Sequence, residues 1–320
     1  MNNAELLDQM LANNAVVSSA ADNALISSIT AWRQRFPAVL ESHSTIQAAF
    51  AGGFRSHWVS IAFACGYRAA LQQLCPQLKA QQIVSFCVTE DEGNSSRAIQ
   101  TRLTAVERGW SLDGKKSFVT GGRDATQLLV AARKGEHEDG RPAIVLILCE
   151  ATAPGLTFED LPHLPFVPEI SHCRIKLQKV AVEAADILPG DGYTHYVKPF
   201  RTIEDMHVFA AVIGYLLRLS RDYQWPEESS EALLVQATTL LDLAKWPPDK
   251  AVTHLSLAGL IGQFNQWLSV SERHWHAVPA EISDAWRRDV PLLDIAEAAR
   301  SKRRDNAWRF YSVGREAGKP

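Results

Sequence analysis

The chain contains two stretches with strong β character: Cys87-Val88-Thr89-Glu90 and, further along, Gly114-Lys115-Lys116-Ser117-Phe118-Val119-Thr120. The first closes a run of β-branched, aromatic and sulfur side chains that begins at Ile83, which is typical of a buried strand. The second follows Asp113. Because Asp-Gly favours a tight hairpin turn, this stretch predicts a turn and then a strand over residues 117–120.

The β character extends in both directions from these stretches, from about residue 81 to residue 193. Arg108-Gly109 is another turn signal. Further strands are predicted over residues 101–107, 127–132, 143–149, 156–161 and 174–182. Since no long helical pattern interrupts them, they predict an antiparallel sandwich or barrel of about 110 residues. Pro189-Gly190-Asp191-Gly192 ends this region.

Helical periodicity is present on both sides of the β region. Before it, apolar residues between Leu25 and Phe36 share one helical face, and Pro37 is expected to stop that helix. A second helix is predicted over residues 56–74, ending before Pro76. After the β region, helices are predicted over residues 206–223, 228–245, 249–275 and 281–308.

The expected fold class is therefore α+β and multidomain. It has an N-terminal helical domain over residues 1–80, a central antiparallel β-sandwich or barrel over residues 81–193, and a C-terminal helical bundle over residues 194–320. Six of the nine tryptophans lie in the last of these regions, where they could build a helical core or a subunit interface.

Composition narrows the class of protein. The 320 residues are 46% hydrophobic and 22% charged, and the formal net charge of −3 argues against nucleic acid as the main partner. The basic run of residues 300–304 is interpreted as a solvated helix face, with contact to a phosphate as the alternative. The five cysteines form no disulfide or zinc pattern, and the N-terminus lacks a secretory signal. We expect a cytoplasmic protein with no membrane span and no metal.

The two opening stretches resemble the acyl-CoA dehydrogenase family. That family enters its β domain with a C/A-x-T-E-P-x-x-G-S-D segment, which is similar to residues 87–96 here. A later G-x-K-x-(W/F)-I-T-N-(G/A) segment is similar to residues 114–122, and an acidic residue before P-G-L-x matches Glu150 and the segment 154–157. The order and spacing of the three segments identify the chain as a shortened, divergent member.

The resemblance implies a flavin cofactor, FAD, and an acyl-CoA or related thioester as substrate. Thr89 and Thr120 would supply hydroxyl groups to the flavin ring, and Phe118 would pack on it. Phe86 and Val88 would line the same wall, and Ser95 matches a position that contacts the acyl-CoA. The alternative is that both threonines are ordinary strand residues and that Phe118 belongs to the sheet core.

Several family elements are absent. Asp91 replaces the proline of the first segment, Ser96 replaces its aspartate, and Glu92 adds negative charge that opposes an anion nearby. The Arg-x-x-Phe-Gly and F-G-G-x-G elements, which hold the adenine and pyrophosphate of FAD in relatives, are missing. Their absence bears directly on whether FAD is held.

The reaction in the family also needs a carboxylate to remove the α-proton of the thioester. By resemblance to the members that carry this base ten residues before a glycine, counting back from Gly214 gives Glu204. The alternative is a helix start, with Thr202 as N-cap and Asp205 near the capping-box position. For His163, His172, His195 and His207, which show no metal-binding spacing, structural or exposed roles are expected.

Two functions remain open from the sequence. The first is a flavin-dependent oxidoreductase that dehydrogenates an acyl thioester, with an electron-transfer partner and a homo-oligomeric state implied by the resemblance. The second is a catalytically degenerate homologue that keeps the scaffold as a binding or interaction module without FAD.

Overall fold

The computed structural model describes residues 1–12, 25–162 and 164–316, without the side chains of residues 313–316. The chain divides into two compact units. The helical unit comprises Met1–Gln73, Pro165–Val167 and Thr202–Pro320, and the β unit comprises Leu74–Leu164 and Pro168–Arg201. The predicted division into three domains stays a prediction.

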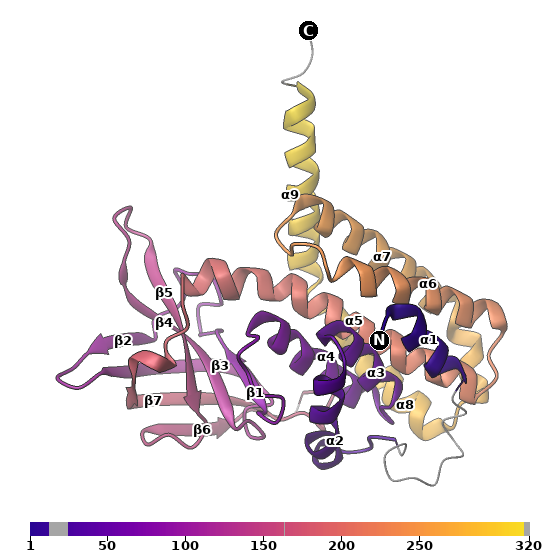
Figure 1. Ribbon diagram of the computed structural model, residues 1–320, viewed down its shortest axis with the longest axis horizontal. Helices are drawn as coiled ribbons and strands as arrows, with labels where there is room; N and C mark the ends of the chain where they lie inside the picture. The colour runs from indigo at the N-terminus through magenta and orange to yellow at the C-terminus, as the bar shows by residue number, and fades with distance from the viewer. Residues whose placement is uncertain (13–24, 163, 317–320) are drawn as a thin grey trace. The chain divides into compact units, whose positions relative to one another are not determined.

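The β unit is one curled sheet of seven strands (Figure 1). The strands are β1 (Val84–Cys87), β2 (Arg102–Ala105), β3 (Trp110–Thr120), β4 (Gln127–Glu136), β5 (Pro142–Glu150), β6 (Leu156–Asp160) and β7 (His172–Val182). Their order is β1-β4-β2-β3-β7-β6, and β5 pairs with the other edge of β4. The pairing is mostly antiparallel, as predicted. The exceptions are β4 with β1, and β4 with β2 at one residue pair, which run parallel.

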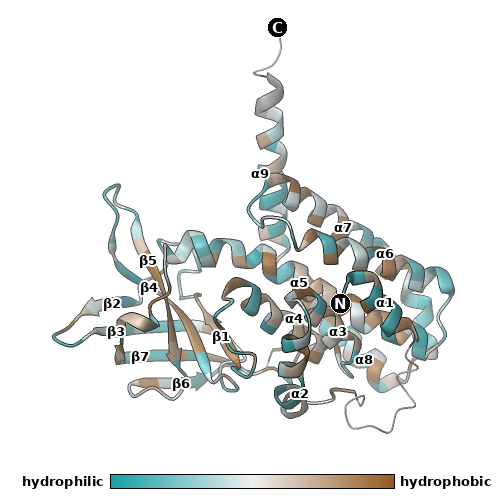
Figure 2. Cartoon of the chain, viewed as in Figure 1, coloured by the Kyte–Doolittle hydropathy of each residue, from teal (hydrophilic) through white to brown (hydrophobic). Residues whose placement is uncertain are grey.

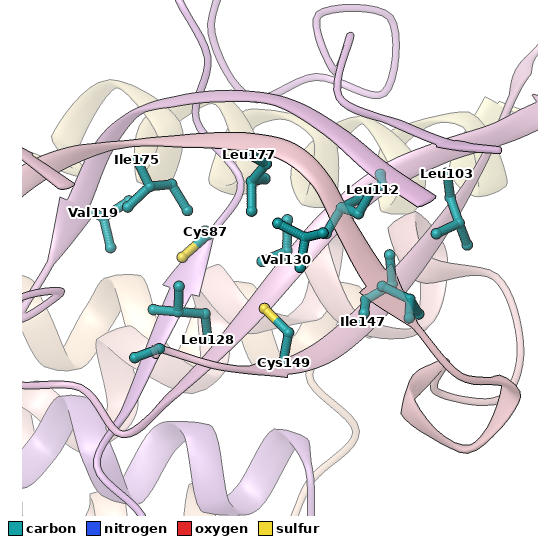
Figure 3. Close-up of a cluster of buried hydrophobic side chains, with 14 of the residues drawn as sticks. Cys87, Leu103, Leu112, Val119, Leu128, Val130, Ile147, Cys149, Ile175 and Leu177 are labelled. Atoms are coloured by element: carbon teal, nitrogen blue, oxygen red, sulfur yellow. The ribbon is translucent and has the colours of Figure 1, made fainter. Parts of the chain in front are cut away.

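The core of the β unit lies inside this curl. Figure 3 shows side chains of β3 and β7 facing those of β4 and β5 across it. Its members include Val119, Val130 and Ile175, none of them more than 1% exposed. Three thiols, those of Cys87, Cys149 and Cys173, belong to the same cluster. Burial raises the pKa of Cys149 to about 12 and that of Cys173 to about 11, so these thiols stay protonated.

Asp113-Gly114 does not form the predicted hairpin turn. The turn between β2 and β3 is at Gly109, whose carbonyl accepts a hydrogen bond from Val106 N. Gly114 lies inside β3 with φ 154° at a β-bulge, where the register with β7 shifts. A Cβ there would lie 2.5 Å from Thr101 Oγ1, so glycine serves the close approach of two segments rather than a turn.

The helical unit contains the two helical regions that the sequence predicts at either end. Its N-terminal helices are α1 (Asn3–Ala12), α2 (Ile29–Ser42), α3 (Thr45–Phe54) and α4 (Val59–Leu74). Its later helices are α6 (Glu227–Leu243), α7 (Ala251–Ser271), α8 (Ala280–Asp289) and α9 (Glu297–Glu316). The long helix α5 (Lys198–Asp222) enters this unit at Thr202. No helix in the described ranges combines the length and apolar character needed to cross a membrane.

The predicted helix over residues 281–308 is two helices, α8 and α9, separated by a 3-10 helix over Val290–Asp294. Two further helix boundaries differ from the prediction. Pro37 lies inside α2 instead of ending it, and the buried side chains of Phe36, Val39 and Leu40 continue along the same helix. Burial of this face outweighs the hydrogen bond that proline cannot donate. The other difference concerns α5, which begins at Lys198, earlier than predicted, directly after a π-helical turn over Tyr193–Val197.

The close contact between α3 and α5 explains why two positions of the helical unit are glycine. A Cβ on Gly53 of α3 would lie 1.9 Å from the carbonyl oxygen of Ala211 in α5. A Cβ on Gly214 of α5 would lie 2.3 Å from the carbonyl oxygen of Phe50 in α3. Neither contact can tolerate a side chain, so the two helices pack backbone to backbone at this point.

Candidate functional site

The two sequence stretches identified first come together at one end of the β unit. Ser117 N donates to the carbonyl oxygen of Thr89 at 2.9 Å, and Ser85 Oγ donates to the carbonyl oxygen of Thr120 at 2.8 Å. These two bonds connect β1 and the segment that follows it with the last residues of β3. Thr89 and Thr120 are therefore held by their backbones close to the same strand end.

Residues 116–120 divide between the inside and the outside of the curled sheet. Lys116 and Val119 are fully buried, whereas Phe118 is 38% exposed and Thr120 is half buried. The register with β7 shifts between Lys116 and Val119, and this extra residue lets both of them face inward. Phe118 and Thr120 consequently share the outer face, so the alternative that Phe118 belongs to the sheet core is wrong.

The hydroxyl groups of Thr89 and Thr120 are not used by the fold. Among the described residues, neither hydroxyl has a hydrogen-bond partner, although both residues are half buried. Strand threonines with a purely structural role commonly bond to a neighbouring backbone group. An exposed aromatic ring that shares its face with the unused hydroxyl of Thr120, close to the backbone of Thr89, is a surface that fits a flat ligand carrying polar atoms on its edge.

His172, for which the sequence predicts only a structural or exposed role, is a further member of this surface. It is the cross-strand partner of Thr120, so their side chains point to the same face. Its ring centroid lies 4.9 Å from that of Phe118. Burial lowers the pKa of His172, and a backbone hydrogen bond to Ile170 only partly opposes this, so the ring is neutral at pH 7. Only the pairing of β3 with β7 reveals this position, and the sequence does not show that pairing.

Phe86 and Val88 lie beside this surface and are buried. Phe86 is 9% exposed, and its ring packs edge-on against Phe200 with a centroid distance of 4.6 Å. Val88 is 6% exposed. Ser95 is exposed at the start of a turn, where its hydroxyl oxygen accepts a hydrogen bond from Ala98 N at 3.3 Å.

Glu90 and Lys116, one residue from each matched stretch, form a buried ion pair that supports the surface from behind. Lys116 Nζ donates to Glu90 Oε1 at 2.7 Å and to the carbonyl oxygens of Ala131 at 2.6 Å and Val88 at 3.4 Å. Glu90 Oε1 also accepts two hydrogen bonds from Thr101. All three ammonium protons thus have acceptors, which is the condition for a stable buried charge.

The pKa values of the two groups reflect this environment. Burial alone would raise the pKa of Glu90, but the Lys116 charge and the hydrogen bonds from Lys116 and Thr101 hold it below its usual value. Burial lowers the pKa of Lys116, and the Glu90 carboxylate opposes that change. Through these hydrogen bonds the pair fixes the segment that carries Thr89 against β3 and β4.

Glu204 belongs to the helical unit, whereas the wall residues belong to the β unit. It lies half buried in the second turn of α5. The predicted helix start at Thr202 is wrong, because α5 already includes residues 198–201. Asp205 does not cap the helix either: its carboxylate pairs with Arg300 at 3.0 Å and with Arg303.

The basic run of residues 300–304 is therefore not uniformly a solvated face. Arg300 and Arg303 point inward to Asp205, and their side chains are only 11% and 19% exposed. Arg304, in contrast, is exposed. His163 lies outside the described residues. Among those that are described, no group of three or more His, Cys, Asp or Glu side chains could hold a metal ion.

Sequence comparison identifies the β unit. Residues 85–180 match the family described as "Acyl-CoA dehydrogenase, middle domain". Over 79 residues the chain is 35% identical to the mitochondrial isobutyryl-CoA dehydrogenase of Dictyostelium discoideum. That match covers 24% of this chain and only 19% of the relative, so it concerns a fraction of the whole enzyme.

Structural comparison covers nearly the whole chain. The prolyl acyl carrier protein oxidase AnaB aligns with a TM-score of 0.67 and 14% identity, over 97% of this chain and 99% of AnaB. FMN-bound TdsC from Paenibacillus sp. A11-2 aligns with a TM-score of 0.67 and 14% identity, over 95% of each chain. At this identity the likeness establishes the fold, which is that of the acyl-CoA dehydrogenases.

Fold and middle domain together define the class: a protein with acyl-CoA dehydrogenase architecture and that family's β domain. Residues 85–180 thus belong to the middle-domain family of the acyl-CoA dehydrogenases, and the chain as a whole is similar to that family in fold.

Proposed function

We propose that the chain binds a flavin on the outer face of β3 and catalyses the α,β-dehydrogenation of an acyl thioester. One observation carries the proposal: Thr89 and Thr120 present hydroxyl groups without partners among the described residues, beside the exposed ring of Phe118. A flavin ring offers a flat apolar surface and polar edge atoms, which suit these three side chains. When bound, flavin supplies the hydride acceptor of the reaction.

The protein's own residues would hold and orient the ring. Phe118 provides an aromatic wall, and the two hydroxyl groups can donate to ring nitrogen or carbonyl atoms. The Glu90–Lys116 pair keeps the segment that carries Thr89 in place, which limits the ordering cost of binding. Phe86 and Val88 support the wall from the apolar side, where Phe86 packs on Phe200.

Glu204 is proposed as the group that removes the α-proton of the thioester. The helix-start explanation for this carboxylate no longer applies, because it lies in the second turn of α5. The neighbouring Asp205 is already engaged by two arginines, so it is a poor proton acceptor. Ser95, exposed at its turn, is proposed to meet the substrate.

The proposal also covers which flavin is bound and which carrier holds the thioester. The sequence lacks the two elements that hold the adenine end of FAD in relatives, and a protein of this fold is described as FMN-bound. Another is described as an acyl carrier protein oxidase. The flavins to compare are thus FAD and FMN. The substrates to compare are thioesters of coenzyme A and thioesters of a carrier protein.

Titration of the full chain with FAD and with FMN tests cofactor binding. We expect quenching of flavin fluorescence with at least one of the two, and weaker binding by Thr120→Val and Phe118→Ala. Glu231→Gln, on an exposed face of α6, should leave binding unchanged. A wild-type chain that takes up neither flavin would overturn the proposal and support the degenerate homologue.

Anaerobic mixing of the flavin-loaded protein with acyl thioesters tests the reaction. Bleaching of the flavin absorbance is expected with wild type and should be lost in Glu204→Gln while flavin affinity stays the same. If bleaching persists in this variant, Glu204 is not the base. A protein that restores the oxidised flavin spectrum after bleaching would be identified as the electron-transfer partner.

A further inference from the structure

Basic side chains continue the outer face of β7 beyond the surface formed by Phe118, Thr120 and His172. Arg174 and Lys176 follow His172 at every second residue of the strand, and both are exposed. Residues two apart on a strand point to the same face, so Arg174 and Lys176 share the face of His172. They lie roughly 7 and 14 Å further along β7.

Strand pairing gives Lys176 two neighbours on this face. Lys115 of β3 is its cross-strand partner on one side, and Thr157 of β6 is its cross-strand partner on the other. Directly opposed residues of antiparallel strands point to the same face, and all three side chains are exposed. Lys115, Lys176 and Thr157 therefore form a row across three strands. Figure 2 shows hydrophilic segments along β3 and β7, in contrast to the hydrophobic β4 and β5.

The fold gives the two lysines of this row no counter-charge. Among the described residues, neither the Lys115 nor the Lys176 ammonium group has a hydrogen bond or an ion pair. The nearby carboxylate of Asp113 already accepts hydrogen bonds from a backbone N–H and a hydroxyl group. Glu159 approaches only Arg174, at 3.9 Å. Because two like charges directly opposite each other destabilise a sheet, an anion bound between the lysines would remove a cost that the fold itself leaves in place.

The donors of the row suit a phosphate group. Ammonium groups form charge-assisted hydrogen bonds with phosphate oxygens, and a threonine hydroxyl adds a neutral donor. The Thr157 hydroxyl has no hydrogen-bond partner among the described residues. FMN and FAD both carry a phosphate at the end of the ribityl chain, which extends away from the flavin ring. A ring on Phe118 and Thr120 therefore has a phosphate-binding row on the same face, further along β7.

We propose that Lys115, Lys176 and Thr157 bind the phosphate on the ribityl chain of the flavin, with Arg174 between this phosphate and the ring. The inference rests on the proposed function, because it concerns the far end of the flavin that is proposed to bind there. It explains how a chain without the elements that hold the adenine end of FAD in relatives retains a flavin: the first phosphate is held by the β unit itself.

Comparison of riboflavin with FMN tests this site, because the two ligands differ only in the phosphate. Fluorescence titration of the full chain should give an affinity for FMN that is about tenfold or more above that for riboflavin. Lys115→Gln/Lys176→Gln should remove most of this preference and leave riboflavin binding unchanged. Both side chains are exposed, so the variant should fold, and its circular dichroism should match that of wild type. The preference should also weaken as salt is added, because exposed charges are screened.

Arg108→Gln is the matched control, since Arg108 is an exposed cation of the β unit at the turn before β3, at the end of the strand opposite to Phe118. It should leave the FMN preference unchanged. Equal wild-type affinities for riboflavin and FMN, or an undiminished preference in the double variant, would overturn the phosphate site while flavin binding stands. If the double variant instead loses affinity only for coenzyme A thioesters, the row binds phosphates of the substrate and the proposal is wrong. A wild-type chain that binds no flavin at all would overturn the proposed function, and this inference with it.

Discussion

Lys116 and Glu90 are joined across the inside of the β unit: Lys116 Nζ lies 2.7 Å from Glu90 Oε1, and the lysine side chain is fully buried. The ammonium group lies beside β4, between two of its pairings. The pairing of β4 with β1 ends at Val130, and its pairing with β2 occurs only at Arg133. Between these two pairings, the carbonyl oxygen of Ala131 accepts a hydrogen bond from Lys116 instead of a strand. The ion pair thus completes the sheet behind the outer face that carries Phe118 and Thr120.

Removal of one partner of this pair should be costly. Lys116→Met leaves the Glu90 carboxylate without its counter-charge, and we expect a loss of about 3–5 kcal/mol in the free energy of unfolding. The double variant Lys116→Met/Glu90→Gln should recover part of this loss because no isolated charge remains. Urea denaturation followed by circular dichroism measures both values. Equal losses in the single and double variants would mean that the charges are not coupled.

Phe118 and Val119 are adjacent but face opposite sides of β3, and their truncation should have opposite consequences. Phe118→Ala removes an exposed ring, so stability should change by less than about 1 kcal/mol while flavin affinity falls. Val119→Ala opens a space in the core and should cost about 2 kcal/mol while leaving the outer face intact. Denaturation curves and flavin titrations on both variants separate the roles. A flavin affinity that is insensitive to Phe118→Ala would remove the ring from the site.

The titration midpoint of His172 should change when a flavin occupies the outer face of β3. Since burial lowers its pKa, its imidazole is expected to titrate with a midpoint below 6.5 in the free protein. A bound flavin would bury the ring further and lower the midpoint again. Nuclear magnetic resonance of the His172 side chain measures both midpoints. Unchanged His172 signals at saturating flavin would place the cofactor elsewhere.

His207 should make the stability of the protein depend on pH. It is fully buried in α5, its Nδ1 donates to the carbonyl oxygen of Ile203 at 2.8 Å, and its Nε2 lies 3.1 Å from Thr45 Oγ1. Desolvation lowers its pKa to about 4, although the Ile203 hydrogen bond opposes the shift. Between pH 6.5 and pH 4 the unfolded chain binds a proton that the folded chain does not, so stability falls as pH falls.

The loss attributable to His207 should reach about 3 kcal/mol at pH 4 and then level off. His207→Gln keeps a polar group at the site but cannot gain this proton. Its stability should therefore decline less steeply than that of wild type over the same interval. Unfolding free energies at half-unit steps of pH provide the comparison. Parallel curves for the two proteins would assign the pH dependence to other groups.

The sequence predicts the β unit better than it predicts the site. Local patterns are enough to place the strands around Cys87 and Phe118, because alternation and turn residues act over a few positions. The role of Gly114 is not local: its close contact is with Thr101, which the pairing of β2 with β3 brings next to it. A pattern that favours a turn in isolation therefore becomes a bulge in the folded sheet.

Long-range contacts account for the remaining differences. Three strands, β4, β5 and β6, separate His172 from Phe118 in sequence, and only antiparallel pairing of β3 with β7 brings their rings together. Thr202 and Asp205 have the pattern of a helix start, but a preceding π-helical turn extends the helix and Asp205 pairs with arginines of α9. Pro37 shows the same effect, since tertiary burial overrides the local signal.

The five cysteines of the chain have a practical consequence. All are buried, and burial raises the pKa of Cys65 to about 12 in the helical unit, as it does for the thiols of the β core. Alkylating reagents need an accessible thiolate, so the native protein should be nearly inert to maleimides. Cysteines placed at Ser95 and at Val235, one in each unit, would then be the reactive positions, and no native thiol would need replacing. The fold is thus suited to site-specific labelling, which allows the distance between the two units to be measured spectroscopically in solution.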